Sequence, residues 1–179
     1  MSKKVLKNYK KVVKCFFAFP SAPDDRKQII EKAIEIVNAS KNPKINFIIT
    51  SWIKMKGKSS NLISTILESI YEAEIVIADI SDLNMNVLFE LGFAFGASKK
   101  LILFTQGNSA ESREKDLSDI EIIRAFKIGK YEDPNILARD LISLLIEKNT
   151  SEAEFSKYNN MGMHLTQVRA IFLQYRHRL

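Results

Sequence analysis

The sequence predicts a doubly wound α/β fold, in which helices cover both faces of a parallel sheet. Three observations support this prediction. Short β-favouring runs alternate along the chain with segments of helical periodicity, and these runs are apolar at nearly every position, as in strands buried on both faces. The chain has 179 residues, 46% of them hydrophobic and 27% charged, enough for one domain with a sizeable core. Alternating strands and helices form right-handed crossovers between parallel strands.

The first two predicted strands are each followed by a helix. We expect the first strand at 12–19, where the apolar run stops at Pro20, and the second at 47–52. Asp24 or Asp25 would cap the first helix. The second helix has one apolar face, formed by Leu62, Ile63, Ile66, Leu67 and Ile70.

Three further strands and two helices complete the predicted sheet. Buried strands at 75–79 and 101–104 flank a helix over 87–97. A short fifth strand around 125–128 precedes Pro134, which suits the first turn of a last helix. Five parallel strands with helices on both faces make a doubly wound, flavodoxin-like sandwich.

The chain divides into one domain, a linker and a terminal helix. The domain covers 1–147 and contains a polar segment, 106–120, that we expect to form a loop or lid. Residues 148–160 are polar and predict a linker. Residues 161–179 predict an amphipathic helix with an apolar stripe of Leu165, Val168, Ile171, Phe172 and Tyr175. We expect this helix to dock on the domain; a dimer contact or the start of a longer protein are the alternatives.

Charge, hydropathy and cysteine content narrow the function classes. The net charge is +6, but no nucleic-acid motif accompanies the basic clusters, so they predict solvated surface and a nucleic-acid partner is not expected. No apolar run approaches the ~20 residues that span a bilayer, and no secretory signal is present, so we expect a cytoplasmic protein without a membrane partner. Cys15 lies in an apolar run and predicts a buried, inert thiol. His164 and His177 lie in the tail, and no metal site is expected.

Glu90 is the anomaly of the sequence. The segment 87–97 is apolar on all sides except at this residue, which predicts a central, enclosed helix with one carboxylate. A buried carboxylate needs a hydrogen-bonding partner, water or a ligand cavity, and a salt bridge with a lysine or arginine is the structural alternative. Asn86, four residues earlier, falls on the same helix face. Gly92 and Gly96 are expected to permit close packing of this helix.

The carboxyl ends of the predicted strands bring polar segments to one rim of the sheet, where ligands bind in doubly wound folds. These segments are 19–26, 52–59, 79–86 and 105–106. The third carries two carboxylates, Asp79 and Asp82, and two amides, Asn84 and Asn86. One of the two asparagines would serve as the N-cap of the following helix.

The segment 75–96, IVIADISDLNMNVLFELGFAFG, resembles the signature of the nucleoside 2-deoxyribosyltransferase-like and TIR-like superfamily. That signature is a hydrophobic strand, an aspartate, a loop with Asn-x-Asn, and Glu-Leu-Gly on a helix. The strand and loop FFAFPSAPDDR resemble the superfamily as well, and the order of elements is similar over 12–147. The resemblance implies cleavage or exchange of an N-glycosidic bond, with Glu90 at the position of the catalytic glutamate.

The chemistry is consistent with that implication. A carboxylate can stabilise the oxocarbenium character that develops on the sugar, or attack its anomeric carbon. Asp79 or Asp82 would hold sugar hydroxyls or assist proton transfer to the base. NAD, as a substrate and not as a cofactor, would need no general acid because its nicotinamide leaves from a pyridinium. A neutral nucleoside would need an acid such as Asp24, Asp25 or Asp79.

Further contacts are implied for the ligand. The resemblance implies that the loop after the first strand covers the base with Phe19, Asp24 and Arg26. Trp52 would stack on the base or close the edge of the sheet. Ser59, in a segment that lacks the spacing of a phosphate loop, would contact a phosphate.

Two enzymatic roles and one non-enzymatic class of function remain as hypotheses for this chain. Bacterial members of the TIR-like branch serve as toxic effectors in antiviral defence, which the resemblance implies here, and a salvage transferase is the second enzymatic hypothesis. The competing hypothesis is a module that senses a nucleotide, or assembles as a homo-oligomer or with a partner protein, without turnover. Substitution of Glu90 separates the classes, because a sensor has no turnover to lose.

Overall fold

The computed structural model describes residues 11–41, 45–55, 61–107, 126 and 128–150. Strands and helices alternate along this part of the chain in the predicted order. They are β1 (Lys11–Ala18), α1 (Asp24–Ala39), β2 (Ile45–Thr50), the 3-10 helix η1 (Trp52–Met55), α2 (Leu62–Glu72), β3 (Ile75–Asp79), α3 (Met85–Gly96), β4 (Lys100–Gln106), β5 (Ile128–Tyr131) and α7 (Pro134–Thr150).

The five strands form one sheet in the order β2-β1-β3-β4-β5, and every neighbouring pair is parallel. The predicted doubly wound, flavodoxin-like fold is therefore confirmed. From β1 the chain passes to β2 on one side and then crosses to β3 on the other, so the winding reverses between β1 and β3. Ligands of such folds bind beyond the carboxyl ends of the strands at this reversal.

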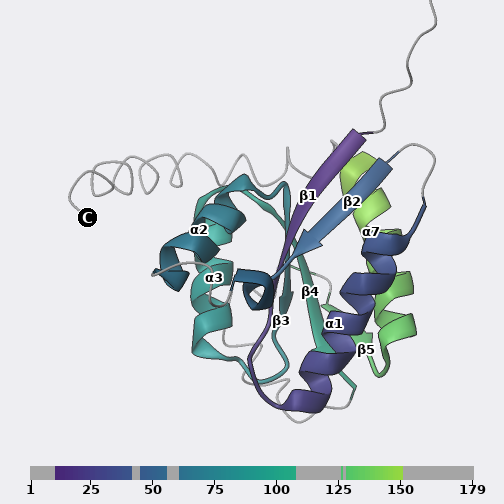
Figure 1. Cartoon of the computed structure of the whole chain (residues 1–179), viewed down its shortest axis with the longest axis horizontal. Coiled ribbons are helices and arrows are strands. Elements are labelled where there is room, and N and C mark those ends of the chain that lie inside the picture. Colours follow the sequence, from purple (N-terminus) through teal and green to yellow (C-terminus); the bar gives the residue numbers. More distant parts are fainter. Residues whose placement is uncertain (1–10, 42–44, 56–60, 108–125, 127, 151–179) are drawn as a thin grey trace, which may run out of the picture.

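Helices cover both faces of the sheet, with α1 and α7 on one face and α2 and α3 on the other (Figure 1). The sheet therefore separates two hydrophobic cores. Phe17 of β1 packs in the core beneath α1 and α7, whereas its neighbour Phe16 packs in the core beneath α2 and α3. Adjacent residues of a strand point to opposite faces, so this central strand contributes to both cores.

The first half of β1 differs from its prediction as a strand buried on both faces. Val12 is 49% exposed, and continuous burial begins only at Cys15. The reason is the register, because β3 starts opposite Cys15 and the earlier residues of β1 pair with β2 alone. Cys15 is buried as predicted, and burial raises the pKa of its thiol to about 12.

The fifth strand lies three residues later than predicted, over Ile128–Tyr131 instead of 125–128. A glycine lowers the strand propensity of a segment, and Gly129 therefore makes the strand over Ile128–Tyr131 difficult to predict from the sequence. In the sheet Gly129 pairs with Phe104, and a Cβ there would lie 2.5 Å from the Phe104 ring. The packing of β4 against β5 thus requires the residue that local propensity disfavours.

Several element ends also differ from prediction. Trp52 belongs to η1 and not to the second strand, which ends at Thr50. The N-cap of α1 is Pro23 and not the predicted Asp24 or Asp25, and no side chain caps the helix there. Asp24 and Asp25 lie in the first turn, where their negative charges interact favourably with the helix dipole. Helix α7 continues to Thr150, beyond the end expected near residue 147.

Helix α3 is less enclosed than predicted. Its buried side is formed by Val87, Glu90, Leu91 and Ala94. Its outer side faces solvent, where Phe89 is 58% exposed. Gly92 and Gly96 do not serve close packing, since a Cβ at either position would meet nothing within 4 Å. One face of the helix therefore packs on the sheet and carries the buried carboxylate.

Three predicted segments lie wholly or partly outside the described residues: the loop beyond Gly107, the linker beyond Thr150 and the terminal helix 161–179. The first three residues predicted as linker, 148–150, belong to α7. Within the described part of the chain, no helix combines the length and hydropathy needed to cross a bilayer.

Candidate functional site

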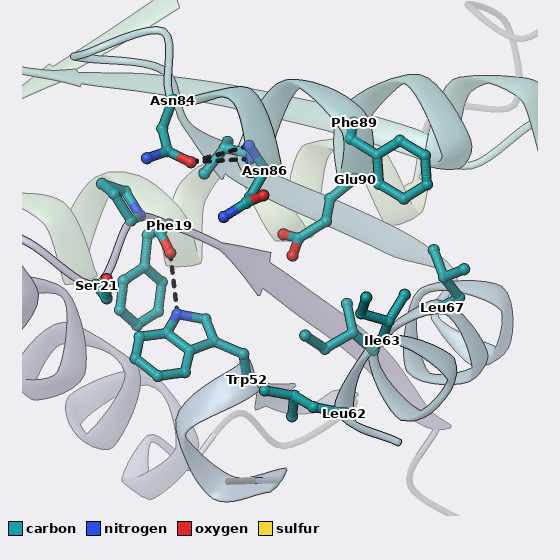
Figure 2. A pocket seen from close by; sticks show the side chains of 13 residues that line it. Phe19, Ser21, Trp52, Leu62, Ile63, Leu67, Asn84, Asn86, Phe89 and Glu90 are labelled. Carbon is teal, nitrogen blue, oxygen red and sulfur yellow. Dashed lines mark hydrogen bonds between the residues drawn. The ribbon is translucent and has the colours of Figure 1, made fainter.

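A cavity of about 380 Å³ lies beyond the carboxyl ends of β1, β2 and β3 (Figure 2). Its walls come from the loop after β1, from η1, and from helices α2 and α3. The described lining residues are Phe19, Pro20, Ser21, Trp52, Leu62, Ile63, Ile66, Leu67, Asn84, Asn86, Val87, Phe89 and Glu90. The cavity therefore occupies the reversal of winding between β1 and β3, where this fold binds ligands.

The carboxylate of Glu90 points into this cavity (Figure 2). Glu90 is 8% exposed, and its Oε2 atom is buried without a hydrogen-bond partner. Burial raises the pKa of Glu90 from 4.5 to about 7. No ion pair to Glu90 forms among the described residues, so the salt-bridge alternative is not what the structure shows. A buried carboxylate oxygen without a partner, on a side chain that lines a cavity, calls for an explanation, and a ligand that reaches the carboxylate would supply the missing partner.

Two asparagines flank the carboxylate. Asn84 is the N-cap of α3, and its Oδ1 accepts hydrogen bonds from the backbone N–H groups of Asn86 (3.0 Å) and Val87 (3.4 Å). This cap fixes the first turn of the helix one turn before Glu90. The side chain of Asn86 extends beside Glu90 into the cavity (Figure 2). Asn84 thus orients the helix, and Asn86 presents an amide to the same space as the carboxylate.

An aromatic wall lies across the cavity from α3. The rings of Phe19 and Trp52 have centroids 6.0 Å apart and are inclined at 52°. The indole Nε1–H of Trp52 donates to the backbone oxygen of Phe19 at 2.9 Å, so its polar group is engaged and its ring surface lines the cavity. This hydrogen bond also ties η1 to the loop after β1.

Helix α2 supplies a wall that sequence reasoning did not place in the site. Near the end of its apolar face, Ile70 packs in the core beneath α2 and α3. The four residues nearer its start line the cavity: Leu62, Ile63, Ile66 and Leu67. Ile63 is 67% exposed, which shows that this apolar face is wider than the core needs. The breadth of the apolar stripe was the signal in the sequence.

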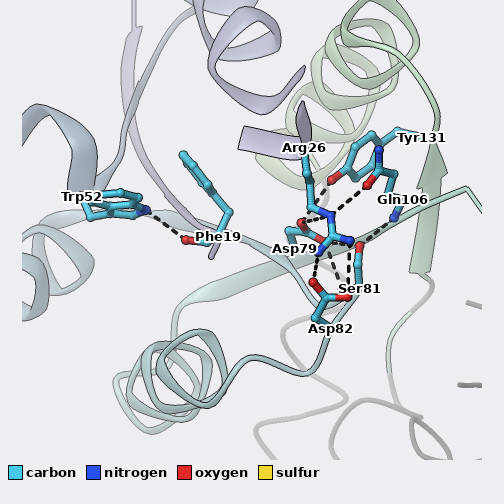
Figure 3. A network of polar contacts seen from close by, with 8 residues as sticks. All are labelled: Phe19, Arg26, Trp52, Asp79, Ser81, Asp82, Gln106 and Tyr131. Carbon is cyan, nitrogen blue, oxygen red and sulfur yellow. Dashed lines mark hydrogen bonds and ion pairs between the residues drawn. The ribbon is translucent and has the colours of Figure 1, made fainter. Parts of the chain in front are cut away.

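The predicted acidic residue Asp79 lies outside the cavity, in a second polar cluster (Figure 3). Its Oδ1 accepts from the backbone N–H of Ser81 at 3.0 Å and from the Ser81 hydroxyl. Its Oδ2 accepts from the Tyr131 hydroxyl at 3.1 Å and lies 3.7 Å from Nε of Arg26. Burial raises the pKa of Asp79, against the opposing effect of these contacts.

Arg26 belongs to the same cluster and is 6% exposed. Its Nε donates to Gln106 Oε1 at 2.8 Å, while Nη1 and Nη2 donate to the two carboxylate oxygens of Asp82 (Figure 3). Neither Arg26 nor Asp82 lines the cavity. Asp24, predicted to meet the ligand, is not in the lining either: its side chain is 84% exposed and lies 4.0 Å from Lys27.

The structure thus separates the predicted site residues into two groups. Five line the cavity: Phe19, Trp52, Asn84, Asn86 and Glu90. Three form the neighbouring cluster: Arg26, Asp79 and Asp82. Ser59 lies outside the described residues. No group of three or more metal-ligating side chains gathers in the part of the chain that the structure describes.

The chain has structural neighbours among solved proteins. No protein-family model matches the chain, and no curated protein matches it. Among solved structures, the chain is similar to a 2-desoxiribosyltransferase from Leishmania mexicana, with a TM-score of 0.42 and 16% sequence identity. The match covers 52% of this chain and 64% of that chain, so this chain spans less than two thirds of the other protein.

Proposed function

We propose that the chain cleaves or exchanges the N-glycosidic bond of a nucleoside or nucleotide held in the cavity, with Glu90 as the catalytic carboxylate. One observation carries this proposal: a buried carboxylate oxygen without a partner points into a cavity at the ligand-binding end of the sheet. The resemblance of segment 75–96 to the nucleoside 2-deoxyribosyltransferase-like signature agrees with it.

The lining suits a base joined to a sugar. Trp52 offers ring surface on which a base stacks, while Phe19, only 3% exposed, packs beside it in the core. The apolar wall of α2 lines the same space. Asn86 and Glu90 lie across from the rings, where a sugar joined to the stacked base would meet them. The amide of Asn86 can donate to a sugar hydroxyl while the carboxylate of Glu90 faces the anomeric carbon.

The reaction then proceeds in two displacements at the anomeric carbon. Glu90 attacks C1′ through an oxocarbenium-like transition state, and the C1′–N electron pair leaves with the base. A water molecule attacks the glycosyl ester in hydrolysis, or a second base attacks it in exchange, and the carboxylate is restored. The attacking group loses one proton, which balances the proton that a neutral departing base takes up. Glu90 acts in its ionised form, which a pKa of about 7 makes available near neutral pH.

Asp79 has a positioning role in this proposal. Its carboxylate contacts Ser81, Tyr131 and Arg26 and does not line the cavity. These contacts hold the loop between β3 and α3, which carries the N-cap of the catalytic helix. The proton-transfer role implied by the resemblance stays a prediction, as does a part in antiviral defence.

Incubation with NAD and a panel of nucleosides and nucleotides, resolved by chromatography, tests the proposal. We expect native protein to release a free base or nicotinamide, and Glu90→Gln to release none above background. Glu68→Gln is a matched control, since Glu68 is exposed on α2 and does not line the cavity. Equal release by native protein and Glu90→Gln would exclude Glu90 as the catalytic group.

A further inference from the structure

Exposed apolar side chains of the described chain gather on α2 and α3. Of the six large hydrophobic residues that are exposed among the described residues, four belong to these two helices and form an α2–α3 patch: Ile63, Tyr71, Met85 and Phe89. Met85 is 78% exposed and Ile63 is 67% exposed. Ile63 and Phe89 come from different helices and both line the cavity, so the patch begins at the cavity mouth (Figure 2). Apolar surface gathered in one place marks an interaction site.

On α2 the patch forms a stripe along the helix. Ile63 and Tyr71, with half-buried Leu67 between them, are four residues apart in turn and share one side over about 12 Å of helix. At the far end of the stripe, Lys99 Nζ lies 5.0 Å from the centroid of the Tyr71 ring. Glu68 is exposed on α2 and borders the stripe. A narrow apolar stripe with an acidic border suits the apolar face of one basic amphipathic helix.

Residues 161–179 match the patch in length and charge. The sequence predicts for them an amphipathic helix whose apolar stripe extends over about 15 Å: Leu165, Val168, Ile171, Phe172 and Tyr175. The segment contains three arginines and no aspartate or glutamate. Arg169 and Arg176 are seven residues apart, so in a helix both fall on the same border of the apolar stripe. That border is complementary in charge to Glu68.

The chain between α7 and this segment is long enough to reach the patch. Helix α7 starts after the carboxyl end of β5 and runs back along the sheet, so Thr150 lies at the edge where β1 begins (Figure 1). Helix α2 ends at the same edge, where Glu72 accepts a hydrogen bond from Lys14 of β1 at 2.9 Å. Layers of secondary structure pack about 10 Å apart, so the path from one helical layer to the other is about 20 Å. The ten residues 151–160 span up to about 33 Å when extended.

We propose that residues 161–179 dock as a helix on the α2–α3 patch, antiparallel to α2. Their apolar stripe packs on Ile63 and Phe89, and Arg169 lies beside Glu68. The direction follows from the connection, which reaches the end of α2 before its start. Because Ile63 and Phe89 also line the cavity, the docked segment borders the cavity mouth. This docking does not depend on the activity proposed above.

Disulfide trapping in the full-length chain tests this arrangement. The one native cysteine, Cys15, is buried, so introduced thiols react without competition from it. We expect Ile63→Cys with Phe172→Cys to form a disulfide within one chain about tenfold faster than two control pairs, because docking raises the local concentration of the thiols. Ile63→Cys with Gln174→Cys moves one thiol to the polar side of the segment. Val12→Cys with Phe172→Cys uses an exposed apolar residue outside the patch.

Charge reversal tests the contact between Glu68 and Arg169. Glu68→Arg and Arg169→Glu should each slow formation of the disulfide between positions 63 and 172 about two- to fivefold. The two reversals together should restore the rate, because they recreate the pair with its charges exchanged. Rates unchanged by either reversal would overturn this contact.

Two results of the trapping experiment would overturn the docking itself. Equal rates for the three cysteine pairs would show that the segment has no preferred place on the domain. A disulfide that joins two chains, seen as a dimer on a non-reducing gel, would assign the patch to a second copy of the protein.

Discussion

Arg26 at the start of α1 forms an ion pair with Asp82 in the loop between β3 and α3 (Figure 3). Both terminal nitrogens of its guanidinium donate hydrogen bonds to the carboxylate of Asp82. The same loop contains Leu83 with a φ of 49°, a left-handed conformation that is uncommon for leucine, immediately before the N-cap Asn84. Such conformations persist where surrounding contacts impose them. The ion pair therefore holds the loop from which α3, the helix that carries Glu90, begins.

Removal of this ion pair should destabilise the protein and misplace α3. We expect Arg26→Met to lower the free energy of unfolding by about 2–3 kcal/mol. The substitution breaks the ion pair with Asp82 and also leaves buried Asp79 without its nearby cation. Arg26→Lys should recover only part of this loss, because an ammonium cannot make the paired contact. Urea unfolding measures both, with Lys32→Met, which removes an exposed cation of α1, as the control. Equal stability of Arg26→Met and Lys32→Met would contradict a role for the ion pair.

The burial of Glu90 predicts a pH-dependent stability. Its pKa in the folded state, about 7, lies above the ordinary 4.5, so its stabilising contribution is complete below pH 4.5 and is lost as pH rises through 7. Glu90→Gln should therefore gain about 2 kcal/mol relative to native protein between pH 5 and pH 8. Chemical unfolding of the two proteins at both pH values measures this difference. A difference that does not change with pH would show that Glu90 is not desolvated.

Ionisation of Glu90 should also control the pH dependence of activity, but in the opposite direction: stability falls as pH rises, whereas activity should increase. Because the proposed reaction requires the ionised carboxylate, log kcat/KM should rise with pH and level off above a pKa of about 7. A pyridinium nucleoside is the suitable substrate, since its base does not titrate in this range. A profile that falls as pH rises through 7 would assign Glu90 to acid catalysis.

The cap of α3 is testable separately. Asn84→Ala removes the side-chain acceptor of the Asn86 and Val87 N–H groups and should destabilise the protein by about 1 kcal/mol. Asn84→Asp should retain most of the stability, because aspartate accepts the same hydrogen bonds. Hydrogen exchange at these two amides should accelerate in the alanine variant. Unchanged exchange would mean that another group caps the helix.

Two glycines should respond oppositely to alanine. Gly129→Ala would place a Cβ against the Phe104 ring and should cost about 1–3 kcal/mol. Gly92→Ala meets open space in the interior of α3 and should stabilise the protein by about 1 kcal/mol. Thermal unfolding of both variants checks the contrast. Destabilisation by Gly92→Ala would indicate that an unseen partner covers this helix face.

The sequence by itself determined the fold class and the central anomaly. Apolar runs such as 75–79 and the helical periodicity between them depend on local patterns, which specify a doubly wound sheet before any contact is known. Glu90 was recognisable because a lone carboxylate in an apolar helix must be satisfied by something. The carboxyl-end rule then placed Phe19, Trp52 and Asn86 near it, and all three line the cavity.

Only the tertiary structure decided which polar residues share the cavity with Glu90. The same rim also carries Asp79, Asp82 and Arg26. They form a separate cluster because two of their hydrogen-bond partners, Gln106 of β4 and Tyr131 of β5, come from strands far along the chain. The cavity wall from α2 and the need for glycine at the start of β5 likewise arise from contacts between elements far apart in the chain. Local patterns specify which elements form, whereas side-chain direction at a shared edge depends on long-range packing, which no local pattern encodes.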